Sequence, residues 1–249
     1  MVVEKHIGRI ATLLFAVLST LCSCTTMYLP NLQNIPAFSK KGDLNAAISP
    51  HNYQLSYAPF KKFGFMVNGS NKNRGILTLD DGKTDNYRVN SYLIEAGVGA
   101  FKDNPKSIIE FFAGFGKGFG SISYDSYLGG KTFPGGGSSH FNKFFIQPNL
   151  VFGKGHIRTS ISTRISVVNF YDFTDESSKA LNSNTPAFFE PALTLILNYD
   201  QVSLKGQLQY SAPSADLNDS FGHYWPYHET ALLMFAIEFH LREIFRKRE

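Results

Sequence analysis

The feature that most constrains this chain is a two-residue alternation of apolar and polar side chains that recurs along most of its length. In the stretch QVSLKGQLQYS, residues 201–211, Val202 and Leu204 fall on one face, whereas Lys205 and Gln207 fall on the other. A period of two is that of a β-strand, whose successive side chains point to opposite faces. The chain is therefore expected to form strands with one apolar and one polar face.

Ten such runs can be counted along the sequence. Several are longer than the usual strand of about 5–6 residues, and many reach the roughly 9–11 residues that a tilted transmembrane strand needs. The predicted spans are 43–50, 52–59, 63–73, 87–101, 107–124, 139–153, 156–171, 187–199, 201–211 and 228–241.

The connections between these runs alternate in length. Short turns rich in Pro, Gly, Asn and Asp are predicted at 58–62, 102–106, 153–155 and 199–201, and long polar loops at 73–86, 126–139, 172–186 and 212–227. Only the short Pro50–His51 connection departs from this order. Short periplasmic turns at one rim and long outer loops at the other are typical of an outer-membrane barrel, and an even number of strands puts both termini on the periplasmic side.

The predicted fold is therefore all-β: a closed antiparallel transmembrane β-barrel of about ten strands over residues 43–241. Hydrocarbon offers no hydrogen-bond partner to backbone groups, and a closed ladder satisfies all of them. A soluble barrel or sandwich, in which the apolar rows face a core, is the alternative.

The N-terminus predicts export and lipidation. Lys5 and Arg9 precede an apolar run at residues 10–21, which is too short to span a bilayer and fits a secretory signal peptide. The sequence LCSC that follows resembles a lipobox, so residues 1–23 are expected to be removed and Cys24 to carry a covalent lipid. An ordinary signal peptide with a chance cysteine is the alternative. A periplasmic segment at 24–42 and a basic periplasmic tail at 242–249 would flank the barrel.

Composition narrows the partners. The formal net charge of the precursor is only +4, which is too small and scattered to favour nucleic acid. Cys22 and Cys24 are the only cysteines, so the mature chain is expected to have no disulfide. Its expected partners are outer-membrane lipids and an extracellular ligand or envelope protein, and no cofactor besides the lipid is expected.

The polar rows of the predicted strands carry charges that a barrel would enclose. A narrow lumen cannot leave such charges unpaired, so a salt-bridged interior is expected. A selectivity ring or a buried acid–base pair is the functional alternative to this structural role. The set comprises Glu95, Glu110, Arg158, Arg164, Glu190, Lys205 and Glu238.

The last predicted loop contains the sequence GHYWPYHE. Tyrosine and tryptophan offer large contact area at small entropic cost, so this loop is a candidate recognition surface through His223, Tyr224, Trp225, Tyr227 and His228. A hydrolase at the rim would use Asp216, Asp219, His223 and His228, but no spacing fixes a nucleophile, a base and an orienting group together. Neither catalysis nor a metal site is predicted.

The sequence AGFGKGFGS, residues 113–121, has the composition of a phosphate-binding loop. Such a loop needs a helix after it, and the sequence that follows is typical of a strand. The stretch is therefore predicted to lie within a strand, with its glycines on one face, where they relieve crowding in the lumen or let the sheet bend. Lys117 would share the outer face with Phe115 and Phe119 and reach lipid headgroups.

The sequences YLPN at 28–31, IPAFSKKGDLNAA at 35–47 and SYAPFKKFGFMVNGS at 56–70 resemble lipidated outer-membrane barrels of Gram-negative bacteria. This resemblance implies a fold and a cellular location, but it implies no catalytic residue. The expected role is structural or interactive, through long outer loops. A narrow channel or small-solute transporter is the first alternative.

Overall fold

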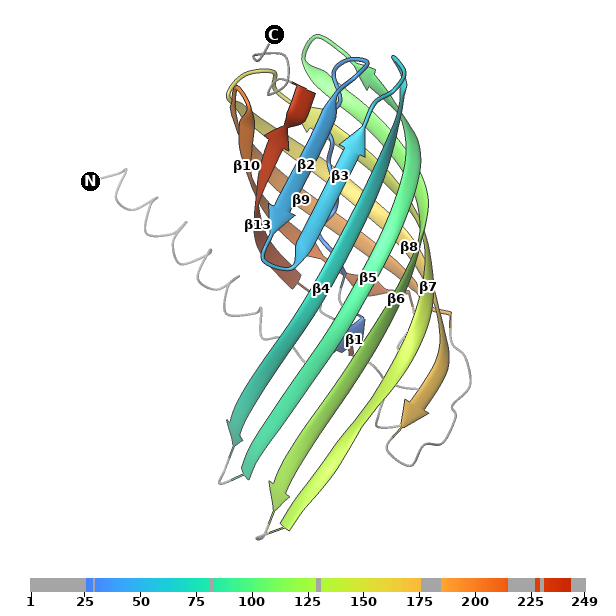
Figure 1. The fold of residues 1–249 in the computed structure, drawn as a ribbon, viewed down its shortest axis with the longest axis vertical. Coiled ribbons are helices and arrows are strands. Elements are labelled where there is room, and N and C mark those ends of the chain that lie inside the picture. Colours follow the sequence, from blue (N-terminus) through green and yellow to red (C-terminus); the bar gives the residue numbers. More distant parts are fainter. Residues whose placement is uncertain are drawn as a thin grey trace, which may run out of the picture.

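The structure, a computed structural model, describes residues 26–28, 30–80, 83–128, 131–175, 185–214, 227–228 and 231–242. It consists almost entirely of β-strands (Figure 1). The strands are β1 (Thr26–Tyr28), β2 (Leu44–Ser49), β3 (Asn52–Tyr57), β4 (Phe63–Asp80), β5 (Lys83–Asp103), β6 (Ser107–Leu128), β7 (Lys131–Phe152), β8 (Ile157–Asp175), β9 (Ala187–Tyr199), β10 (Val202–Tyr210), β11 (Ala212–Pro213), β12 (Tyr227–His228) and β13 (Ala231–His240).

Ten of these strands close into a barrel. Each strand from β2 to β9 pairs with the next along the chain, β13 pairs with β10, and β13 also pairs with β2, so the sheet returns to its start. All of these pairings are antiparallel. The predicted all-β, closed, ten-stranded antiparallel barrel is confirmed.

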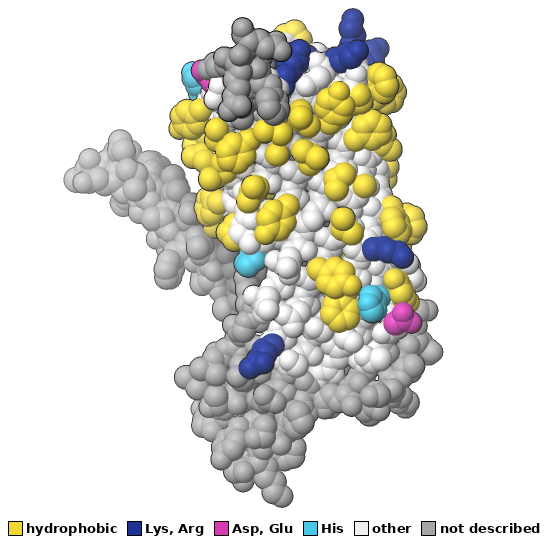
Figure 2. Space-filling view, in the orientation of Figure 1, with side chains coloured by type: hydrophobic (Ala, Val, Ile, Leu, Met, Phe, Trp, Pro, Cys, Tyr) yellow, Lys and Arg dark blue, Asp and Glu magenta, His cyan; other side chains and the backbone are white. Residues whose placement is uncertain are grey.

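The barrel has a polar interior and an apolar exterior. On β8, Ser162, Arg164 and Ser166 are buried, whereas Ile161 and Ile165 are exposed. The predicted two-faced pattern therefore turns its polar row inward. Every strand of the barrel exposes at least one large apolar side chain, and these side chains form a broad band in the upper part of the face seen in Figure 2.

The two ends of the barrel differ. At one end, called here the short-turn end, residues 58–62, 104–106, 153–156 and 200–201 connect neighbouring strands. At the other, called here the loop end, β4 to β7 project far beyond β2 and β3 (Figure 1). The C-terminal end of β13 lies at the short-turn end, where His240 pairs with Asn45 of β2.

Two of the four predicted long loops are wrong. Residues 73–86 belong almost entirely to β4 and β5, with Asp80 paired to Lys83, and residues 126–139 to β6 and β7, with Leu128 paired to Lys131. The prediction followed the end of apolar alternation, but ladder pairing depends on the backbone. Polar strands can therefore continue where a hydrophobic pattern stops. Of the other two predicted loops, 176–184 and 215–226 lie outside the described residues.

The wall of the barrel is uneven. β2 and β3 have six residues each, whereas β4 has 18. β13 pairs with β10 from Ala231 to Phe239 but with β2 only from Ile237 to His240. The β2–β3 hairpin ends beside β4 at His51, whose carbonyl oxygen accepts a hydrogen bond from the Asn71 N–H at 3.0 Å. Beyond this point β13 and β4 continue toward the loop end, whereas β2 and β3 do not. This difference in strand length is called here the step.

The glycines of AGFGKGFGS lie inside β6 and face the interior, as predicted, while Lys117 is exposed on the outer face. A Cβ on Gly114 would overlap the Phe145 ring and the Ala96 carbonyl oxygen, and one on Gly118 would overlap the Phe141 ring. These glycines therefore make room for two aromatic side chains of β7.

Replacing Gly114 with alanine should lower the free energy of unfolding by about 1–3 kcal/mol, because the added methyl group overpacks a filled interior. Equilibrium urea unfolding of the refolded barrel measures this. Gly155→Ala is the matched control, since no atom lies within 4 Å of its Cβ position, and it should leave the midpoint unchanged. Equal stability of the two variants would contradict the interior packing described for β6.

Candidate functional site in the barrel interior

The interior of the barrel is occupied by the chain's own N-terminal segment. Residues 30–38, called here the luminal segment, precede β2 and are nearly all buried, with Asn31, Gln33 and Asn34 each 1% exposed. The sequence predicts a periplasmic segment at 24–42, outside the barrel, whereas the structure puts its central part within the lumen. An extended segment of this kind has no periodicity that could have indicated its place.

Strand side chains satisfy the backbone of the luminal segment one residue after another. Gln54 donates to the Leu32 carbonyl oxygen at 2.9 Å, and Gln147 donates to that of Asn34 at 2.7 Å. Gln207 donates to the Gln33 carbonyl oxygen at 3.1 Å and accepts from the Gln33 N–H at 2.9 Å. Buried backbone groups must find partners, and long amide side chains supply them here in place of a paired strand.

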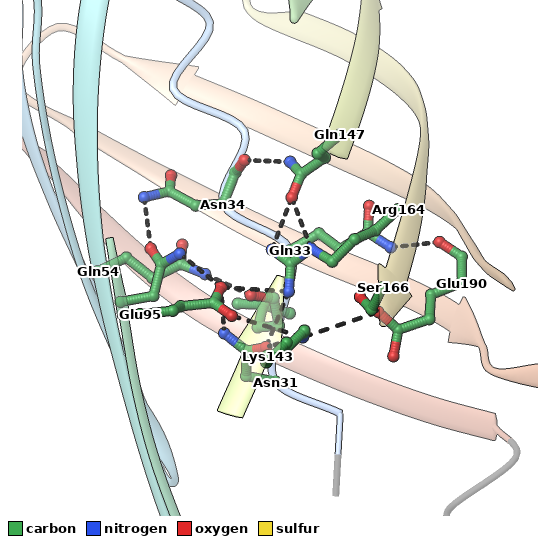
Figure 3. A network of polar contacts seen from close by, with 12 residues as sticks. Asn31, Gln33, Asn34, Gln54, Glu95, Lys143, Gln147, Arg164, Ser166 and Glu190 are labelled. Atoms are coloured by element: carbon green, nitrogen blue, oxygen red, sulfur yellow. Dashed lines mark hydrogen bonds and ion pairs between the residues drawn. The ribbon is translucent and has the colours of Figure 1, made fainter. Parts of the chain in front are cut away.

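A charge network lies at the level of Asn31 (Figure 3). Glu95 of β5 forms ion pairs with Arg164 of β8 at 3.2 Å and with Lys143 of β7 at 3.4 Å. Lys143 also lies 3.8 Å from a carboxylate oxygen of Glu190 on β9. All four charged side chains are completely buried. Two acids and two bases from four strands therefore balance one another across the lumen.

Asn31 joins the luminal segment to this network. Its side-chain Nδ2 donates to Glu95 at 2.9 Å, and its side-chain Oδ1 accepts from Arg164 at 2.8 Å. Arg164 also donates twice to Gln147 Oε1, at 2.6 and 2.8 Å, and Asn68 donates to Glu95 at 2.9 Å. The charged groups are thus hydrogen-bonded as well as paired, which offsets part of the cost of removing them from water.

Glu110 and Lys205 hold the luminal segment nearer the short-turn end, and Glu238 holds Lys205. Glu110 accepts the Phe38 N–H at 2.9 Å, and Lys205 donates to the Ile35 carbonyl oxygen at 2.8 Å. Lys205 also pairs with Glu238 at 2.5 Å. Of the predicted luminal charges, the side chains of Glu95, Glu110, Arg164 and Lys205 therefore contact the luminal segment.

Arg158 stands apart from these pairs. Its side chain is half-buried at the short-turn end, its Nε is buried without a hydrogen-bond partner in the described part of the chain, and it lines a polar cavity together with His156, His240 and Arg242. Arg242 donates to the Lys41 carbonyl oxygen at 2.6 Å, and the rest of the predicted basic tail, 243–249, lies outside the described residues.

Aromatic contacts close the interior on either side of the network. Tyr28 packs against Phe188 and Phe141, with ring centroids 4.6 and 5.7 Å apart, and its hydroxyl donates to Glu190 at 2.9 Å. On the short-turn side Phe38 is fully buried against a cluster that includes Phe101 and Phe112. The lumen is therefore filled along the luminal segment.

The interior set predicted from the sequence omits Lys143 and every residue of the luminal segment. Lys143 shares the inner face of β7 with Phe141 and Phe145, and the ring of Phe145 lies 5.9 Å from its ammonium group. The alternation could have identified this lysine, because 139–153 is one of the predicted strands.

Several predicted residues lie outside the described parts of the chain. These are Cys24, Asp216, Asp219, His223, Tyr224 and Trp225. The backbones of Tyr227 and His228 form β12, which pairs in parallel with β1. The candidate recognition surface in this loop therefore stays a prediction.

No protein-family model matches this chain, and a search of curated proteins finds no match to it. Within the described ranges, no helix is long and apolar enough to cross a membrane. The same described residues hold no group of three or more His, Cys, Asp or Glu side chains arranged to bind a metal ion.

Replacing Glu95 with glutamine should lower the free energy of unfolding by about 3–5 kcal/mol, because Arg164 and Lys143 would stay buried beside a neutral group. Urea unfolding at neutral pH measures the loss. Asp103→Asn is the matched control: it breaks the partly exposed ion pair with Lys154 and should cost less than about 1 kcal/mol. Similar losses in the two variants would contradict a buried network at Glu95.

Proposed function

We propose that this protein is an outer-membrane β-barrel, anchored additionally by a lipid on Cys24, whose lumen is sealed by its own N-terminal segment. Its role is structural or interactive, and it presents the loop end to an extracellular ligand or envelope protein. Neither an enzymatic activity nor nucleic-acid binding is part of the proposal. The observation that carries it is the inverted pattern of burial, with charges inside and large apolar side chains exposed outside on every strand of the barrel.

The exterior is too apolar for a surface in water. Phe235, Ile157 and Ile94 are each more than 60% exposed, and comparable side chains follow on every strand around the barrel. Soluble monomers rarely expose contiguous apolar patches of more than a few hundred Å². Each Å² removed from water stabilises the protein by about 25 cal/mol. A bilayer is the environment that would cover such a belt on all sides at once.

The backbone hydrogen bonding of the closed barrel also fits a bilayer. The wall is a ladder without a free edge at the level where β2 joins β13, so its N–H and C=O groups are paired within the sheet. Closed barrels and helices are the structures that satisfy backbone groups in hydrocarbon. The proposed orientation puts the short-turn end in the periplasm and the loop end outside, as in other barrels of this kind.

The filled lumen argues against the channel alternative. A barrel of about eight strands is just wide enough to be filled by side chains, and open pores use about 16 strands. Ten strands leave some additional room, which the luminal segment and its hydrogen-bond partners occupy. An interior filled in this way along residues 30–38 favours a closed lumen over an open channel. The loop end is then the part of the molecule left to meet a partner.

Replacing Leu193 with arginine should distinguish a bilayer from water outside the barrel. Leu193 lies midway along β9 and is 51% exposed. In lipid vesicles a charge near the bilayer centre should cost about 2–4 kcal/mol of folding free energy, whereas an exposed substitution in a soluble protein usually changes it by less than about 0.5 kcal/mol.

Asn73→Arg is the matched control, because Asn73 is exposed on the same outer surface but lies on β4 toward the loop end, beyond the apolar side chains. It should cost about 0–1 kcal/mol in the same vesicles. Reversible unfolding with urea gives both values. An equally small loss of folding free energy in Leu193→Arg and Asn73→Arg would contradict the membrane proposal.

The sealed lumen predicts that the purified full chain conducts no current in planar bilayers, across a range of salt concentrations. A general porin inserted under the same conditions is the positive control. Folding is checked by the slower migration of the boiled sample on a gel, and insertion by co-flotation of the protein with lipid vesicles. Reproducible unit conductance from the inserted protein would replace the proposed role with that of a channel.

A further inference from the structure

The luminal segment runs along the barrel axis in one direction. Its contacts with β7, whose last residue Phe152 lies at the short-turn end, move steadily away from that end as the chain is followed backward. The contacts are those of Ile35 with Val151, Asn34 with Gln147, Asn31 with Lys143, and Tyr28 with Phe141. The chain therefore passes through the lumen from the loop side to the short-turn end, where it enters β2.

The described residues just before the luminal segment, Thr26–Tyr28 of β1, lie on the loop side. β1, which contains Thr26 and Tyr28, pairs in parallel with β12. β12 belongs to the connection between the last residue of β10, Tyr210, and the first of β13, Ala231, and these two residues pair with each other at the loop end of their strands. The start of the described chain is thus held to a loop-end connection.

The step in the wall lies on the same side. Among the described strands, Ala231–Ala236 of β13 has no pairing partner on its β2 side, and β4 continues beyond the β2–β3 hairpin without a partner on its β3 side. An unpaired edge in hydrocarbon is costly. The step therefore calls for a physical explanation. An N-terminal chain that leaves the lumen toward the membrane at this place would provide it.

We propose that the lipid-bearing Cys24 emerges at the loop end and inserts its acyl chains in the leaflet on that side, which in the proposed orientation is the outer leaflet. Cys24 lies two positions before Thr26, so their Cα atoms are at most about 7 Å apart. The lipid has no way back to the short-turn end, because the luminal segment already fills the lumen. This inference rests on the proposed function, since it needs the membrane and the lipid.

The inference reverses the sequence-based expectation that both termini are periplasmic. β13 still ends at the short-turn end, but the N-terminus and the lipid lie on the opposite side of the membrane. An extended segment held by Gln54, Gln147 and Gln207 would then connect an outer-leaflet anchor to β2 through the barrel. The lipid would then anchor the luminal segment from outside the barrel, while the strands hold the same segment inside it.

The experiment is cysteine labelling of the full chain in the outer membrane of intact Gram-negative cells, with a membrane-impermeant maleimide. One variant carries the insertion GSCGS between Cys24 and Thr25. The control is Lys41→Cys, which is exposed at the short-turn end, and the mature chain has no other free thiol. We expect the inserted cysteine to label equally before and after permeabilisation, and Lys41→Cys to label only afterward.

The possible failures are distinguishable. Absence of the protein from the outer-membrane fraction would overturn the proposed function, and this inference with it. Protein present in that fraction with both thiols reacting on the same side would overturn only the inference.

Discussion

The structure depends on the neutralisation of charges that the barrel encloses. Glu95 and Glu190 lie beside Lys143 and Arg164 in the buried interior. Asn31 of the luminal segment is hydrogen-bonded to both Glu95 and Arg164. Ion pairs in such a place repay their desolvation only when the remaining donors and acceptors are also satisfied. The segment and the network therefore require each other.

This mutual requirement decides what the barrel can do. A lumen that needs the N-terminal segment for its hydrogen bonds stays filled, and Gln54, Gln147 and Gln207 keep the segment extended through it. In the proposed function the apolar exterior holds the molecule in a bilayer, while the projecting hairpins of β4 to β7 extend the loop end. The proposed role as a surface-presenting barrel follows from this division between a sealed inside and an exposed rim.

Much of the fold could be predicted because alternation is a local property. Successive side chains of a strand point to opposite faces, and polar and apolar residues alternate in the sequence in the same way. Ser162, Arg164 and Ser166 therefore face inward and Ile161 faces outward. The prediction failed where that signal ended, since the polar ends of β4 to β7 are held by backbone pairing that side-chain chemistry does not report. Lys143 carries the same alternation, since it shares the inner face of β7 with Phe141 and Phe145.

The sequence by itself determined the two faces of each strand and put Glu95, Arg164 and Glu190 on the polar face, because both follow from a period of two. The tertiary structure decided that this polar face is the enclosed one. Only the tertiary structure decided that residues 30–38 lie inside the barrel. This segment has no period of its own, and its backbone partners come from positions as far away as Gln207. Such a placement exists only once the strands have closed around it.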